Sequence, residues 1–165
     1  MSRDKLQKMP LFQKSMEILE IVDRIADLVP PEKEFLKEVA EFMRADATQI
    51  PAKIAGAFGE VPYDLKMENA TIIRKNAMQI YVQCNSFFME EDFKETEYLK
   101  MLRNEIEEFR VLFAEWVKTF DPWDYYIDRW GLFNPPGVNY DDKDPDKDIP
   151  FNDFLEGDDD DDDDN

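Results

Sequence analysis

The chain has 165 residues and carries 39 acidic against 20 basic side chains, which gives a formal net charge of −19 at pH 7. Hydrophobic residues make up 43%, enough for one domain with its own core, but no apolar run is long enough to predict a transmembrane helix. Histidine is absent, so the commonest general base and the commonest metal ligand are both missing. We therefore expect neither an enzyme nor a bound cofactor or metal.

Four segments have apolar residues at the three- and four-residue spacing of an amphipathic helix. We expect helices over about residues 11–29, 32–58, 62–88 and 99–120. Pro30 ends the first segment and Pro122 follows the last, because proline cannot continue a helix. Pro51 lies inside the second segment, where the apolar pattern continues across it, so we expect a kink there rather than an end.

The connections between these segments are short, and a short link between long helices forces antiparallel neighbours. The sequence thus predicts an all-α fold, an antiparallel up-down-up-down four-helix bundle over residues 8–121. An aromatic appendage follows over residues 122–134, and we expect it to pack on the bundle. Residues 135–165 hold 14 acidic against 2 basic side chains and end in seven aspartates before Asn165, which predicts a disordered acidic C-terminal tail.

The start of the chain and its cysteine content bear on location. The N-terminal residues lead into an amphipathic segment rather than an apolar one, so we expect no signal peptide. Cys84 is the only cysteine and cannot form an internal disulfide, which agrees with a reducing compartment. We expect a cytoplasmic protein that does not enter a membrane.

The second helical segment contains the most specific pattern of the chain, over residues 44–59. It resembles the second-helix signature of the four-helix-bundle family of 23S rRNA intervening-sequence proteins and diversity-generating retroelement accessory proteins. The matching residues are Arg44, Ala47, Ile50, Pro51, Ala52, Ile54, Ala55, Phe58 and Gly59. Lys53 stands where asparagine is usual, and Gly56 and Ala57 stand where Glu-Gly is usual. The resemblance extends over roughly residues 8–121.

The resemblance implies a homopentamer that acts as an accessory protein to a reverse transcriptase. Basic residues commonly follow the Phe-Gly pair in this family, but Glu60 and Val61 stand there in this chain. We therefore expect a non-enzymatic oligomeric adaptor for a reverse transcriptase or another nucleic-acid enzyme, with only indirect contact to nucleic acid. Two alternatives stay open: an acidic nucleic-acid mimic that sequesters a basic protein, and a purely structural oligomer.

The third helical segment has an unusual charge pattern. Residues 69–89 contain no Asp or Glu, although acidic residues dominate elsewhere. A solvated face in this chain would be expected to carry acids, so their absence indicates an oligomer interface or, alternatively, a contact with a partner or nucleic acid. The candidate binding residues on or near this helix are Lys53, Lys66, Arg74, Lys75, Gln79 and Gln83.

Aromatic side chains are dense just after the bundle. Trp123, Tyr126 and Trp130 are the candidate binding residues of this appendage. Two interpretations are open: the rings cap one end of the bundle, or they form an exposed docking site for a partner.

The acidic tail contains a second group of large apolar residues. Phe151, Phe154 and Leu155 lie among aspartates and Glu156. Aromatic anchors with flanking acids are typical of disordered segments that fold onto a basic groove. The alternative is a tail that only raises solubility.

Overall fold

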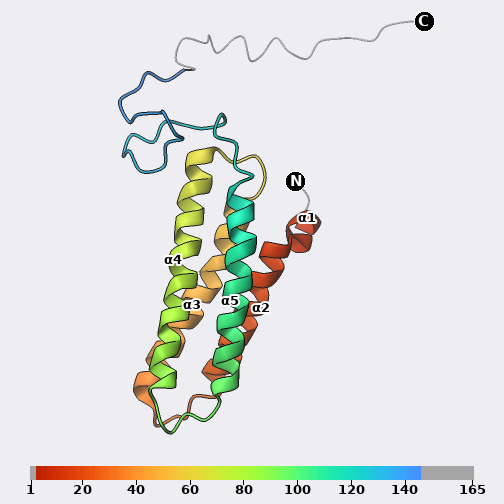
Figure 1. The fold of residues 1–165 in the computed structure, drawn as a ribbon, viewed down its shortest axis with the longest axis vertical. Helices are drawn as coiled ribbons and strands as arrows, with labels where there is room; N and C mark the ends of the chain where they lie inside the picture. Colours follow the sequence, from red (N-terminus) through yellow and green to blue (C-terminus); the bar gives the residue numbers. More distant parts are fainter. Residues whose placement is uncertain (1–2, 146–165) are drawn as a thin grey trace, which may run out of the picture.

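Four long antiparallel helices form the body of the molecule (Figure 1). The computed structural model describes residues 3–145, and this part of the chain contains helices and loops but no strand. The long helices are α2 (Pro10–Asp27), α3 (Glu34–Gly56), α4 (Tyr63–Phe88) and α5 (Thr96–Val117), and the short helix α1 (Arg3–Lys8) precedes them. The predicted all-α bundle is confirmed.

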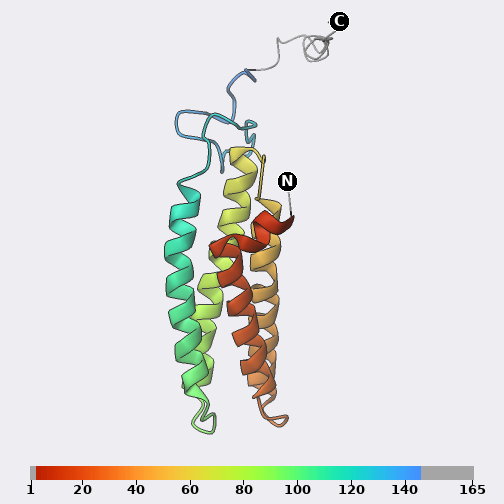
Figure 2. The ribbon, with the colours of Figure 1, turned by 90° about the vertical axis from the view of Figure 1, so that its right-hand side faces the viewer.

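The helices surround one core. Helix α2 packs against α3 and α5, and α4 packs against the same two helices (Figures 1 and 2). The loops over residues 28–33, 57–62 and 89–95 are short, so each helix runs antiparallel to both of its neighbours. We call the end of the bundle where α4 begins and α5 ends the appendage end.

Each long helix buries one apolar face. The largest fully buried side chains are Phe87, Phe109, Ile18, Ile25, Leu36, Met43, Ile50, Ile54, Ile73, Ile80, Leu99 and Leu102. Two buried polar side chains find partners: Ser15 Oγ donates to the Phe12 carbonyl at 2.6 Å, and Asn76 Nδ2 donates to Gln49 Oε1 at 2.9 Å. Leaving such a group unpaired would cost about 1–3 kcal/mol.

Helix α3 continues through Pro51, as the unbroken apolar pattern predicted, and ends at Gly56. Pro51 itself is buried, as is Ala47 one turn earlier. Ala52 and Ala55 lie on the exposed side of the helix instead. Among the small residues of this segment, Ala47 therefore packs in the core of the chain, whereas Ala52 and Ala55 do not.

The helix boundaries differ from the sequence expectation at two places. Helix α1 was not predicted, because it has only six residues and no buried side chain. Pro10 is the first residue of α2, a position where its missing N–H costs no hydrogen bond. At the other end, α5 stops at Val117, and the N–H of Phe120 donates to the Val117 carbonyl in a turn.

An ion cluster joins α2 to α5. Lys14 Nζ lies 2.7 Å from Glu105 Oε2, 2.7 Å from Glu108 Oε2 and 3.0 Å from Glu17 Oε2. The side chains of Lys14 and Glu105 are only 17% and 21% exposed, so water screens this pair weakly. The hydrogen bonds to Glu105 and then Glu108 raise the pKa of Lys14 above its ordinary value.

Replacing Lys14 by methionine should lower the free energy of unfolding by about 1–2 kcal/mol at pH 7, since it leaves the half-buried Glu105 without its cation. Because the folded pKa of Lys14 is raised, its contribution is complete below the unfolded value of about 10.4 and is lost only as the pH rises further. Urea unfolding at pH 7 measures the loss.

Lys100→Met is the matched control, because the exposed Lys100–Glu97 pair lies within one helix turn. We expect a change below about 0.5 kcal/mol for that variant. Equal losses for the two variants would contradict a special contribution from the Lys14 cluster.

Candidate functional site

The aromatic appendage, residues 122–134, is part of the irregular segment that follows α5 and covers residues 118–145. It lies at the appendage end of the bundle (Figures 1 and 2). Two hydrogen bonds hold it to the start of α4: the N–H of Tyr63 donates to the Asp124 carbonyl at 2.6 Å, and the N–H of Tyr126 donates to Asp64 Oδ1 at 2.9 Å. The appendage is therefore a fixed extension of the bundle.

Asp128 organises the middle of the appendage. Its carboxylate accepts the N–H groups of Trp130 at 2.9 Å, of Leu132 at 2.8 Å and of Phe133 at 2.8 Å. The backbone of Asp128 is paired twice with the Asn134 side chain, at 2.7 and 2.9 Å. The hydrogen bond from Phe133, followed by those from Trp130 and Leu132, holds the pKa of the Asp128 carboxyl below its usual value.

Replacing Asp128 by alanine should release this loop, because three backbone N–H groups lose their acceptor. We expect the amide hydrogens of Trp130, Leu132 and Phe133 to exchange with solvent about tenfold faster or more, measured by hydrogen exchange at pH 7. Asp124→Ala is the control, since its side chain makes no such bonds in the described part of the chain, and we expect no change there. Slow exchange that survives Asp128→Ala would contradict the assignment.

The lowered pKa of Asp128 also predicts how the stability of the loop changes with pH. A depressed carboxyl pKa stabilises the folded form above the ordinary value of 3.8, and the effect is lost as the pH falls through the folded value. Protection of the three amides should therefore collapse below about pH 3.8 in the natural chain, after correction for intrinsic exchange. The Asp128→Ala variant should show no such step.

Arg129 extends the ordered loop toward the C-terminus. Its Nη1 donates to the Tyr140 carbonyl at 2.9 Å and to the Asp142 carbonyl at 2.6 Å. Pro135 is buried as well. Disorder was expected from residue 135 onwards, and that boundary is wrong for residues 135–145, because these contacts fix them. The remainder of the acidic tail lies outside the described residues.

Several large apolar side chains of the appendage face solvent. Trp130 is 92% exposed, Trp123 87%, Leu132 75% and Tyr126 67%. The capping of the bundle is done by Phe120, which is buried and meets the Trp116 ring edge-on at 4.7 Å. Packing on the bundle, which we expected for the appendage, therefore does not hold for its two tryptophans or for Tyr126.

Two nearly fully exposed tryptophans on an ordered loop are unusual for a protein that acts alone, since large exposed apolar patches mark interaction sites. Tryptophan is also enriched among the residues that contribute most to protein interfaces. The same segment, over residues 118–145, holds six aspartates against three basic residues. This segment therefore combines exposed aromatic side chains with a net negative charge.

The candidate residues of α4 are divided between two sides of the helix. Arg74 lines a groove toward α5, whereas Lys75 lies on the side that faces α3, near Asp46. Burial raises the pKa of Asp46, and Lys75 and a hydrogen bond with Gln83 partly offset this effect. Gln79 and Gln83 lie on this α3 side, in a small surface hollow.

The other two basic candidates also lie apart. The Lys66 ammonium lies 5.5 Å from the centre of the Phe120 ring, at the appendage end. Lys53 is half-buried near the end of α3. The basic side chains predicted near the second and third helical segments therefore do not form one continuous track for phosphate groups.

The outer face of α4 is free of acids and partly apolar. Met78 is 53% exposed and Val82 is 57% exposed, beside Thr71, Lys75 and Gln79. The acid-free segment, residues 69–89, therefore contributes to the solvent-accessible surface of the bundle.

Phe151, Phe154 and Leu155 lie outside the described residues. Within residues 3–145, no group of three or more carboxylate or cysteine side chains is placed to hold a metal ion. The helices of that part of the chain are all too short or too polar to cross a lipid bilayer.

The only cysteine is inert. Cys84 is fully buried, and burial raises the pKa of its thiol to about 11, against a smaller opposing effect of Arg103. The thiol is therefore protonated at neutral pH and is a poor nucleophile.

Comparisons with protein-family models, with curated proteins and with solved structures found no match for this chain.

Proposed function

We propose that this chain is a non-enzymatic, homopentameric adaptor that binds a reverse transcriptase or another nucleic-acid enzyme through its aromatic appendage. The observation that carries the proposal is the exposure of Trp123 and Trp130 on a loop that Asp128 and Asp64 hold in place. A preordered loop loses little conformational entropy on binding, so its apolar area is available for affinity. The absence of histidine and the inert Cys84 support a role without catalysis.

The charge of the chain supports this class of partner. Enzymes that act on nucleic acid carry basic surfaces, because Lys and Arg contacts to phosphate supply much of their affinity. Residues 118–145 hold six aspartates against three basic residues, and the whole chain has a net charge of −19. Opposite charges accelerate association and orient the partners. Direct binding of nucleic acid to the adaptor is disfavoured by the same charge.

The pentamer rests on the resemblance of residues 44–59 and on exposed surface that the single chain leaves uncovered. Val82 on α4 and Phe35 and Phe42 on α3 are each more than half exposed. An oligomer interface would remove such side chains from water. The lone, reduced cysteine fits a cytoplasmic location.

Binding to a purified reverse transcriptase from the same source, measured over a salt series, tests the adaptor role. We expect submicromolar binding that weakens as the salt concentration rises. Displacement of the adaptor by duplex DNA would favour the alternative of a nucleic-acid mimic, because the two would then occupy one site. No binding to this enzyme or to any other nucleic-acid enzyme of that source would contradict the proposal.

Light scattering in solution tests the pentamer separately. We expect a mass near five times the 19.6 kDa of one chain. A monomer mass at micromolar concentration would reject the pentamer and leave the appendage as the only binding surface of the proposal.

A further inference from the structure

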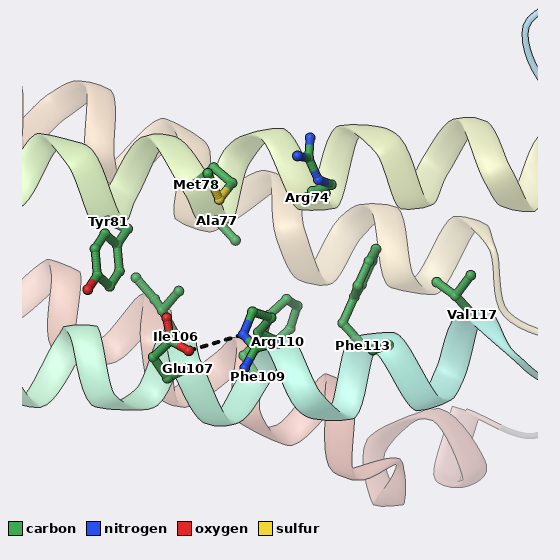
Figure 3. A pocket seen from close by; sticks show the side chains of 11 residues that line it. Arg74, Ala77, Met78, Tyr81, Ile106, Glu107, Phe109, Arg110, Phe113 and Val117 are labelled. Atoms are coloured by element: carbon green, nitrogen blue, oxygen red, sulfur yellow. Dashed lines mark hydrogen bonds and ion pairs between the residues drawn. The ribbon is translucent and has the colours of Figure 1, made fainter.

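A groove runs between α4 and α5. Its volume is about 590 Å³, within the range of known ligand sites, and Figure 3 shows the side chains that line it. Ala77 and Met78 come from α4, and Phe113 and Val117 come from α5. Phe109, which is buried, closes the bottom. The lining is therefore mainly apolar, and the two helices leave it uncovered.

The two ends of the groove are fixed by cation–ring contacts. At one end the guanidinium of Arg103 stacks 4.6 Å from the centre of the Tyr81 ring and donates to the Tyr81 carbonyl at 3.1 Å. At the appendage end, Lys66 lies over the Phe120 ring, three residues after Val117. The groove is thus a preformed feature of the bundle between these two contacts.

Basic side chains dominate the rim of the groove. Arg74 stands on the α4 side and makes no hydrogen bond or ion pair with the other described residues. On the α5 side, Arg110 Nε binds Glu107 Oε2 at 3.0 Å, and Glu107 is the single acid of the lining (Figure 3). Helix α4 has no acid from residue 69 to its end. In a chain of net charge −19, this groove is suited to an acidic segment with apolar anchors.

The chain contains a segment of that chemistry. Residues 148–156 read Asp-Ile-Pro-Phe-Asn-Asp-Phe-Leu-Glu, with Phe151, Phe154 and Leu155 at relative positions 0, 3 and 4. In a helical turn this spacing would put the three apolar side chains on one side, the arrangement by which peptides bind apolar grooves. The acids between and beside them are complementary to Arg74 and Arg110.

The tether between the described chain and this segment is short. The described chain ends at Pro145, beyond the same end of the bundle as the Val117 end of the groove (Figures 1 and 2). Phe151 follows six residues later and Leu155 ten residues later, so extended chain spans up to about 20 Å and about 35 Å. The groove extends along twelve residues of α5, from Ile106 to Val117, or about 16 Å.

We propose that the groove between α4 and α5 binds residues 148–156 of the same chain, with Phe151, Phe154 and Leu155 in the apolar lining and their neighbouring acids against Arg74 and Arg110. A short tether gives a local concentration in the millimolar range, so even weak intrinsic affinity fills the groove. The inference does not depend on the adaptor role, which the appendage carries.

Photo-crosslinking in the full chain tests the occupant. Ala114 is exposed and lines the groove, so a benzoylphenylalanine at position 114 would report on whatever lies there. Ala45, which is exposed on α3, is the matched control. We expect a product at the mass of a single chain in which position 114 is joined to residues 146–157, and no such product from position 45.

Two outcomes of the crosslinking would overturn the proposal. A product at the mass of two chains, joined helix to helix, would make the groove an interface between copies. Crosslinks from position 114 that never reach residues 146–157 would show that the segment does not occupy the groove.

Methyl NMR of the full chain with labelled methionines gives an independent measurement that does not perturb the groove. Met78 lines the groove, whereas Met89, which is 82% exposed, lies at the far end of α4. Replacing Phe151, Phe154 and Leu155 together by alanine should shift the Met78 methyl signal and leave that of Met89 in place. An unchanged Met78 signal would reject the proposal.

Discussion

Replacing both Trp123 and Trp130 by alanine should weaken binding of the reverse transcriptase about 100-fold or more, while the stability of the bundle stays the same. Truncation of a central tryptophan in an interface costs about 2–4 kcal/mol, and each 1.4 kcal/mol is a factor of ten. The two rings are 87% and 92% exposed in the free chain, so their removal takes almost no contact from the fold. We expect a change in unfolding free energy within about 0.5 kcal/mol.

Phe35→Ala together with Phe42→Ala is the matched control for the tryptophan pair. These rings are 65% and 64% exposed on α3, away from the appendage end. We expect this control to retain binding, although it is free to alter the oligomer mass. Calorimetry or interferometry measures the affinities, and urea unfolding measures stability. If the tryptophan variant still binds the enzyme, the proposal that the appendage forms the binding surface is contradicted.

Replacing Arg103 by alanine should lower the free energy of unfolding by about 2–3 kcal/mol, the largest stability effect we expect from a side chain that is not fully buried. The guanidinium joins α5 to α4: it donates to the Tyr81 carbonyl at 3.1 Å and to Asn85 Oδ1 at 2.7 Å. It also stacks on the Tyr81 and Phe88 rings at 4.6 and 4.8 Å. These helices leave a groove between them, so this contact carries much of their attachment.

Arg103→Lys should recover little of that loss, because an ammonium cannot stack between two rings as a planar guanidinium does. Lys100→Ala is the matched control on the same helix, since Lys100 is exposed and pairs with Glu97 one turn away. We expect a loss below about 0.5 kcal/mol there. Similar losses for Arg103→Ala and Lys100→Ala, measured by urea unfolding, would contradict the bridging role.

The long helices could be predicted because each has an apolar stripe with breaks at its ends. Pro30 and Pro122 marked boundaries in the sequence, and the stripe around Pro51 indicated that α3 continues through it. These signals are local, so one sequence is enough to find them. The short α1 could not be found in this way, because six residues without a buried face carry no periodic signal.

The sites were harder to predict, because exposure depends on contacts between distant segments. The density of rings after Pro122 marked the appendage, but the sequence did not show that Asp128 holds the Trp130 backbone or that the Trp130 ring is exposed. The groove was not predicted at all, since its lining residues belong to ordinary apolar stripes on two helices. Lys14 and Glu105 are 91 residues apart, and nothing local connects them.

Hydrogen exchange of the full chain, with and without the reverse transcriptase, tests the central claim most directly, because it locates the contact without any substitution. We expect slower exchange over residues 121–133 in the complex, with smaller changes along α2 and α3. Protection confined to the outer face of α4, with the appendage exchanging as fast as in the free chain, would contradict it.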